Sequence, residues 1–75
     1  MSADDLFADG KKLGSEGKHK DAIACYDKAI EIDPKYANAW NGKGVALLSL
    51  KRYEDAITCY DKVIEIDPKY ANAWN

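Results

Sequence analysis

Apolar residues recur along this chain at steps of three and four, which is the spacing of amphipathic helices. Trp40, Gly44 and Leu47 share one such helical face. Pro34 and Pro68 each end a helix, because proline cannot donate to the helical ladder and disfavours helix in the residue before it. No stretch alternates with a period of two, so no strand is expected. The pattern predicts helices over Ala3–Ser15, Lys18–Asp33, Ala37–Leu50 and Tyr53–Asp67.

The chain also repeats its own sequence. The stretch from Asp21 to Asn41, DAIACYDKAIEIDPKYANAWN, returns from Asp55 to Asn75 as DAITCYDKVIEIDPKYANAWN, at an offset of 34 residues. The two copies differ only at Ala24/Thr58 and Ala29/Val63. A fixed period of this length is typical of solenoid proteins, in which each unit buries its apolar face only by stacking on its neighbours.

The residues of this repeat resemble the tetratricopeptide repeat family, whose signature of Trp, Leu-Gly, Tyr, Ala, Phe and Pro spans 34 residues. The second unit supplies Trp40, Gly44, Leu47, Ala56, Tyr60 and Pro68 at the corresponding places. The first unit supplies Gly10, Leu13, Ala22, Tyr26 and Pro34, with Leu6 in the place of the tryptophan. Asp9 and Lys43 stand where the family usually has leucine.

The resemblance covers nearly the whole chain and implies an all-α fold, an alpha-alpha superhelix of antiparallel helix pairs. It places a first repeat at about 3–36, a second at about 37–70 and the start of a third at 71–75, all in one domain of 75 residues. In such an arrangement Gly10 and Gly44 lie where paired helices cross closely. Tyr26 then fills the space between neighbouring units.

The resemblance also implies protein–protein interaction, because in that family the first helix of each unit lines a concave groove that receives a peptide or a partner helix. Carried over position by position, the groove residues are Asp4, Phe7, Lys11, Asn38, Asn41, Val45, Leu48, Ser49, Asn72 and Asn75. The spacing 38, 41, 45, 48 independently describes one helical face. Asparagine amides both donate and accept hydrogen bonds, which suits peptide recognition, but Asn38 and Asn72 suit helix capping equally well.

Candidate catalytic and metal chemistry is sparse. The one histidine, His19, has no partner in an arrangement that supports nucleophilic catalysis. Two cysteines and one histidine lack the spacing of a zinc site. Acidic residues cluster at helix ends and repeat with the unit, as on a solvated face. We therefore expect no enzyme activity, no metal and no cofactor.

Composition and charge further limit the classes of binding partner that we expect. Of the 75 residues, 47% are hydrophobic and 32% are charged, and the net charge is −2. This balance gives no reason to expect nucleic acid or a membrane as partner. Cys25 and Cys59 hold the same place in the two units, and packed helices lie roughly 8–10 Å apart, beyond the reach of a disulfide. Free thiols fit a reducing compartment, so we expect a cytoplasmic protein.

A competing hypothesis is a structural repeat fragment, or an engineered near-consensus sequence, that has no ligand of its own and associates with itself. The repeated sequence stops at Asn75, one turn into a fifth predicted helix. This leaves Tyr60, Val63, Ile64 and Trp74 as the residues of self-association. The hypothesis predicts a homodimer.

The joints between helices suggest how such a dimer would form. Residues 14–19, GSEGKH, hold two glycines, whereas residues 48–53, LSLKRY, hold none. A tight turn in the second joint must place Lys51 or a neighbour in backbone space that glycine occupies freely. Opening that turn would fuse residues 37–67 into one helix and exchange its distal half with a second copy. End-to-end docking of two closed chains is the alternative.

Overall fold

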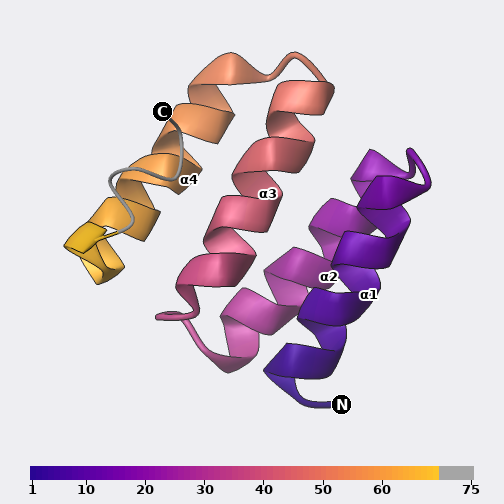
Figure 1. Cartoon of the computed structure of the whole chain (residues 1–75), viewed down its shortest axis with the longest axis horizontal. Coiled ribbons are helices and arrows are strands. Elements are labelled where there is room, and N and C mark those ends of the chain that lie inside the picture. The colour runs from indigo at the N-terminus through magenta and orange to yellow at the C-terminus, as the bar shows by residue number, and fades with distance from the viewer. Residues whose placement is uncertain (70–75) are drawn as a thin grey trace.

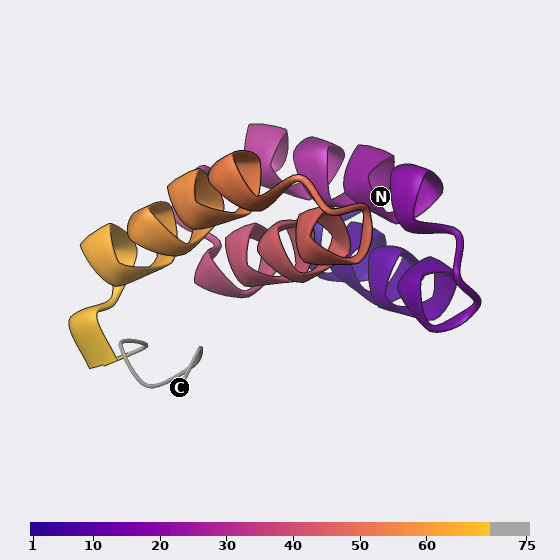
Figure 2. The same ribbon diagram turned by 90° about the horizontal axis from the view of Figure 1, so that it is seen from above.

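The computed structural model describes residues 1–69, which form four α-helices (Figure 1). The helices are α1 (Ala3–Ser15), α2 (His19–Ile32), α3 (Ala37–Ser49) and α4 (Tyr53–Ile66). Each helix runs antiparallel to the one before it (Figure 1). Seen from above, α2 and α4 lie on one side of the molecule and α1 and α3 on the other (Figure 2). The predicted all-α fold of helix pairs is confirmed.

The helix ends follow from local chemistry. Ser2 and Asp5 form a capping box, in which each side chain accepts a hydrogen bond from the backbone N–H of the other and so fixes the start of α1. Asp33 and Asp67, predicted as the last residues of their helices, instead have extended backbones with φ of −135° and −141°. The proline that follows each of them disfavours the helical conformation, so both helices end one residue earlier than predicted.

Tyrosine rings that lie on glycines set the distances between helices. Tyr26 of α2 is only 4% exposed, because its ring is held between α1 and α3. A Cβ atom on Gly10 would lie 2.6 Å from the ring, and one on Gly42 would lie 2.7 Å from it. Tyr60 of α4 meets Gly44 of α3 in the same way, at 2.8 Å. The predicted close crossings at Gly10 and Gly44 are confirmed, and Gly42 adds a contact that the sequence reading missed.

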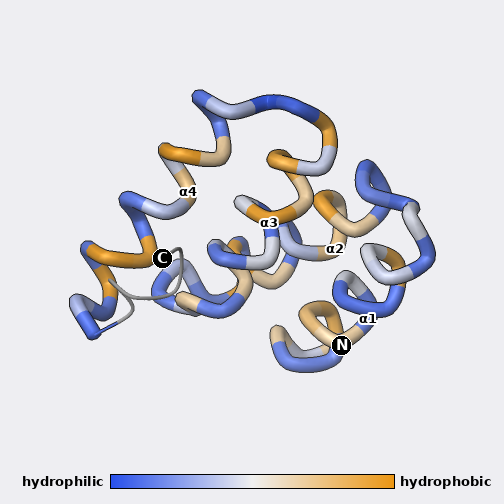
Figure 3. The backbone as a smooth tube through the Cα atoms, turned by 45° about the horizontal axis from the view of Figure 1, so that its top comes forward, coloured by the Kyte–Doolittle hydropathy of each residue, from blue (hydrophilic) through white to orange (hydrophobic). Residues whose placement is uncertain are grey.

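Small side chains let the helix backbones approach one another around these rings. The fully buried alanines are Ala22, Ala29, Ala39 and Ala56, each 0% exposed. One buried cluster joins Leu6 to two of these alanines, and a second joins Leu47, Ala56 and Cys59, with Trp40 packed half-buried against it. Apolar residues recur along each helix between polar ones (Figure 3). Each helix therefore packs through one apolar face, and the contacts between these faces form the core.

The two turns within the helix pairs have the same geometry but different residues. Gly17 and Lys51 occupy equivalent places, with φ of 80° and 62°. In each turn the next backbone N–H, from Lys18 or Arg52, donates to a leucine carbonyl at 2.9 or 2.8 Å. The left-handed conformation is natural for glycine and strained for lysine, as predicted for this joint.

The turn at Lys51 is closed in this structure. Exchange requires one continuous helix over residues 37–67, whereas α3 ends at Ser49 and α4 packs back on α3 in the same chain. Strain of about 1–2 kcal/mol at one lysine favours opening. Opening would not by itself lose the burial of Leu47 and Cys59, because exchange restores the same contacts with a second copy. The structure therefore has the closed turn, and helix exchange with a second copy stays a prediction.

We predict opposite effects of alanine at two glycines of α1. Gly10→Ala should lower the free energy of unfolding by about 1–2 kcal/mol, because the new methyl group meets a Tyr26 ring that Gly42 holds from the other side. Gly14→Ala should raise it by about 0.5–1 kcal/mol, because the nearest side-chain atom is 4.0 Å away and alanine favours helix. Urea melts of both variants provide the test. Equal effects would mean that ring contact does not set the helix spacing.

We predict a second opposite pair at the two turns. Lys51→Gly should stabilise the protein by about 0.5–1 kcal/mol, since relief of the left-handed backbone exceeds the entropy that glycine adds to the unfolded chain. Gly17→Ala, at the equivalent place, should destabilise it by about 1 kcal/mol. Thermal melts of the two variants check this. A destabilising Lys51→Gly would show that the turn is unstrained.

Candidate ligand-binding groove

An open hollow of about 460 Å³ lies between α1 and α3, and we call it the groove. Its lining comes from three helices: Phe7, Lys11, Gly14 and Ser15 from α1, His19 and Tyr26 from α2, and Asn38, Asn41, Gly42, Val45 and Ala46 from α3. Gly42 has no side chain to cover the Tyr26 ring. The buried ring therefore forms the floor of the groove.

The α1 wall of the groove is aromatic. The Phe7 ring lies 6.0 Å from the Tyr26 ring and 5.4 Å from the Tyr36 ring, both measured between centroids and both tilted. The Lys11 ammonium lies 5.6 Å from the Phe7 centroid, within the range of a cation–π contact. The side chain of Val45, 50% exposed, stands on the α3 wall. Phe7 and Val45 thus offer apolar surface on two sides of the groove.

Two asparagine amides on α3 are unengaged. Asn38 is exposed and Asn41 is half-buried, and neither side chain hydrogen-bonds to any residue of 1–69. Tyr36 occupies the N-cap of α3, and this helix start has no side-chain cap. The suggestion that Asn38 caps the helix is therefore wrong for this structure. Both amides are available to the carbonyl and N–H groups of a ligand backbone.

The lining of the groove carries the basic side chains of Lys11 and His19 and no carboxylate among the described residues. The carboxylate of Asp4, at the start of α1, accepts a hydrogen bond of 2.6 Å from the Tyr36 hydroxyl. A ligand carboxylate near Lys11 would meet attraction without a competing acid in the lining.

The structure brings together half of the ten residues predicted for this site. Phe7, Lys11, Asn38, Asn41 and Val45 line the groove. The other described residues, Asp4, Leu48 and Ser49, do not line it. The Ser49 hydroxyl instead donates to the Val45 carbonyl at 3.3 Å, and the Leu48 side chain is 42% exposed on α3. Asn72 and Asn75 lie outside the described residues.

Gly42 and Tyr26 also line the groove, although the sequence pattern did not predict them there. Tyr26 packs between the units as predicted, and it also lines the groove, because Gly42 has no side chain to cover that part of its ring. A signal for Gly42 was present, since glycine inside a helix costs about 1 kcal/mol and often marks a close approach. His19 reaches the groove from the start of α2, which its polar neighbours gave no reason to expect.

The predicted self-association residues need a correction. Val63 is 1% exposed, because it shares the buried face of α4 with Ala56 and Cys59, at steps of three and four. Tyr60 and Ile64 are half-buried. The large apolar side chains that α4 exposes are Tyr53 and Ile57, each 57% exposed, and neither was predicted. Trp74 lies outside the described residues.

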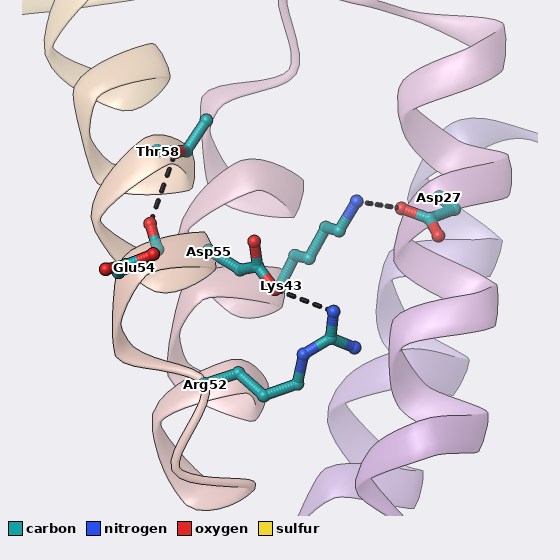
Figure 4. A network of polar contacts seen from close by, with 6 residues as sticks. All are labelled: Asp27, Lys43, Arg52, Glu54, Asp55 and Thr58. Carbon is teal, nitrogen blue, oxygen red and sulfur yellow. Dashed lines mark hydrogen bonds and ion pairs between the residues drawn. The ribbon is translucent and has the colours of Figure 1, made fainter.

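A network of polar contacts surrounds Lys43 of α3 and the start of α4 (Figure 4). The Lys43 ammonium lies 2.6 Å from the Asp27 carboxylate of α2, and Arg52 pairs with Asp55 at 2.7 Å. Lys43 stands where the resembled family has leucine, and its side chain is 25% exposed. Its ammonium also lies 5.9 Å from the centroid of the Trp40 ring. The lysine thus links the two repeated units by charge where an apolar contact is usual.

Cys59 lies beside this network, and Cys25 is half-buried on α2. Burial raises the pKa of the Cys59 thiol above its ordinary value. The Lys43 ammonium lowers that pKa and the Asp27 and Asp55 carboxylates raise it, and burial is the larger effect. The Cys59 thiol is therefore held protonated at neutral pH.

The described part of the chain was searched for metal-binding clusters and for membrane-spanning helices. Residues 1–69 hold no group of three or more His, Cys, Asp or Glu side chains placed to bind a metal ion. None of the helices in this part combines the length and the apolar character needed to cross a membrane.

Comparison with known proteins gives two family matches. A family model described as tetratricopeptide repeat matches residues 37–70, and one described as TPR repeat matches residues 10–51. The chain is also similar to an uncharacterized protein of Methanocaldococcus jannaschii, with 36% identity over 50 residues. That alignment covers 67% of this chain and 58% of the archaeal protein, so this chain spans little more than half of its relative.

We predict that the two thiols differ in reactivity. In the folded protein at pH 8, Cys59 should react with a thiol reagent more slowly than Cys25, because Cys59 is buried and burial raises the pKa of its thiol. Since folding favours the protonated thiol, this group should stabilise the fold below pH of about 8.5 and contribute less as the pH rises further. Mass spectrometry after timed modification measures both rates. Faster reaction of Cys59 would contradict the prediction.

Proposed function

The chain belongs to the tetratricopeptide repeat family, and from this premise we propose that it binds a peptide or a partner helix in the groove between α1 and α3. Members of this family are generally interaction modules without catalytic activity. The observation that carries the proposal is the groove itself, in which Phe7 and Lys11 of one unit face Asn41 and Val45 of the next across the Tyr26 floor.

The proposed ligand lies along the groove with its backbone against α3. The unengaged amides of Asn38 and Asn41 pair with its carbonyl and N–H groups. One apolar side chain of the ligand packs on Tyr26 between Phe7 and Val45. An acidic side chain, or a terminal carboxylate, sits near Lys11, where the lining carries no opposing acid.

Self-association is the second candidate function. Tyr53 and Ile57 on α4 supply exposed apolar surface for it, and a homodimer of closed chains docked through α4 remains a prediction. A cytoplasmic location likewise remains a prediction from the free thiols.

The proposal is tested with peptides selected from a displayed library of random 12-residue sequences. For a selected peptide, Val45→Ala should weaken binding about fivefold, as loss of a contacting apolar side chain costs on the order of 1 kcal/mol. Ile57→Ala, which removes an equally exposed side chain from α4, is the matched control and should leave the affinity unchanged. Neither change should alter the free energy of unfolding by more than about 0.5 kcal/mol.

Two results would contradict groove binding. One is a selection that yields no peptide with saturable binding. The other is a set of peptides whose affinity falls with Ile57→Ala and not with Val45→Ala, which would move the ligand site to α4.

A further inference from the structure

The floor of the groove contains a hydroxyl group that the packing of the helices does not use. Tyr26 is 4% exposed and lines the groove. Its hydroxyl makes no hydrogen bond to any residue of 1–69, whereas the hydroxyl of Tyr36 donates to the Asp4 carboxylate at 2.6 Å. Buried polar groups in proteins almost always have a hydrogen-bond partner, so the Tyr26 hydroxyl is available to one that enters through the groove.

The contacts of the ring show where this hydroxyl lies. A Cβ atom on Gly42 would be closest to Cζ of Tyr26, the ring atom that carries the hydroxyl, at 2.7 Å. A Cβ atom on Gly10 would instead be closest to Cε1, at 2.6 Å. Among residues 1–69, no side-chain nitrogen or oxygen is both fully enclosed and without a partner. The hydroxyl therefore keeps access to the groove, on the side where Gly42 has no side chain to cover it.

The protonation state of the hydroxyl determines what it can bind. Burial raises the pKa of Tyr26 above its ordinary value, so the hydroxyl stays protonated at neutral pH and can donate a hydrogen bond. The lining also holds the ammonium group of Lys11. A carboxylate is the acceptor that complements a donor hydroxyl in a lining that carries a lysine, because hydrogen bonds to an ionised acceptor are the stronger kind.

We propose that Tyr26 selects ligands with an internal glutamate, whose carboxylate accepts a hydrogen bond from the Tyr26 hydroxyl. This rests on the proposed function, and it identifies the acid near Lys11 as a side chain instead of a terminal carboxylate. A ligand backbone that pairs with Asn38 and Asn41 lies along α3, above the floor of the groove. A glutamate side chain extends from that backbone to the floor, because two methylene groups separate its carboxylate from the Cα carbon.

The variant Tyr26→Phe removes the hydroxyl and keeps the ring that packs on Gly10 and Gly42. The test begins with two selections from a displayed library of random 12-residue sequences, one on the whole 75-residue protein and one on this variant. The peptides are displayed through their C-termini, so none has a terminal carboxylate. The unchanged protein should enrich glutamate at one aligned position, and the variant should lose that enrichment.

Affinities then measure the contact itself. For a fluorescein-labelled, C-terminally amidated peptide selected on the unchanged protein, Tyr26→Phe should weaken binding about tenfold, as loss of a hydrogen bond to a charged group does. Replacing the glutamate of the peptide by methionine should cost at least as much, and Tyr26→Phe should then cost nothing further. Tyr53→Phe, which removes an exposed hydroxyl from α4, is the matched control and should leave the affinity unchanged.

Thermal melts separate binding from folding. Because the hydroxyl has no partner within residues 1–69, Tyr26→Phe should keep the melting temperature within about 3 °C of that of the unchanged protein. A larger fall would show that the hydroxyl supports the fold and would overturn the proposal.

The binding results distinguish this inference from the proposed function. Equal enrichment of glutamate by both proteins, or additive losses from Tyr26→Phe and the methionine peptide, would overturn the inference. Peptides that lose affinity with Val45→Ala and not with Tyr26→Phe would overturn it while leaving groove binding intact. A selection without any saturable peptide would overturn both.

Discussion

The spacing of the helices depends on one kind of contact, a tyrosine ring seated on a glycine backbone. Tyr26 is the central case, since it touches Gly10 on one side and Gly42 on the other. A methyl group at either glycine would need the space that the ring fills, and the ring cannot retreat from one without meeting the other. Three helices are thereby fixed by one side chain. Because the same ring is the floor of the groove, the constraint that sets the packing also shapes the candidate binding site.

Most of the fold could be predicted from the sequence because its determinants are local. Proline at 34 and 68, the 34-residue period and the three-four spacing of apolar residues together specify helices with ends accurate to one residue. The turn at Lys51 shows where this reasoning stopped. The missing glycine correctly predicted a left-handed lysine, but whether the turn opens also depends on contacts with a second copy, which a local pattern does not measure.

The groove was predicted less completely because a site between helices combines positions that no single pattern links. The face of α3 carrying Asn38, Asn41 and Val45 follows from helical spacing alone. Gly42 lies beside that face, and its lack of a side chain leaves the Tyr26 ring open to the groove. His19 reaches the groove from another helix, α2. The prediction that Val63 is exposed for self-association was wrong for a similar reason. Whether an apolar residue near the end of a repeat faces the core or the outside depends on where the neighbouring helix packs.

The shared position of Tyr26 has a consequence for how the molecule opens. Tyr26 is a residue of α2, and its ring contacts α1 and α3. These three helices therefore unfold together, although the border between the two repeats lies between α2 and α3. Helix α4 contacts α3 alone among the other helices, and its release leaves the Tyr26 packing intact. Amide hydrogens of α4 then exchange through a partial opening, while those of α1, α2 and α3 wait for a larger one. By stability the helices thus divide into a block of α1, α2 and α3 and a separate α4. By sequence they divide into two repeated pairs, α1 with α2 and α3 with α4.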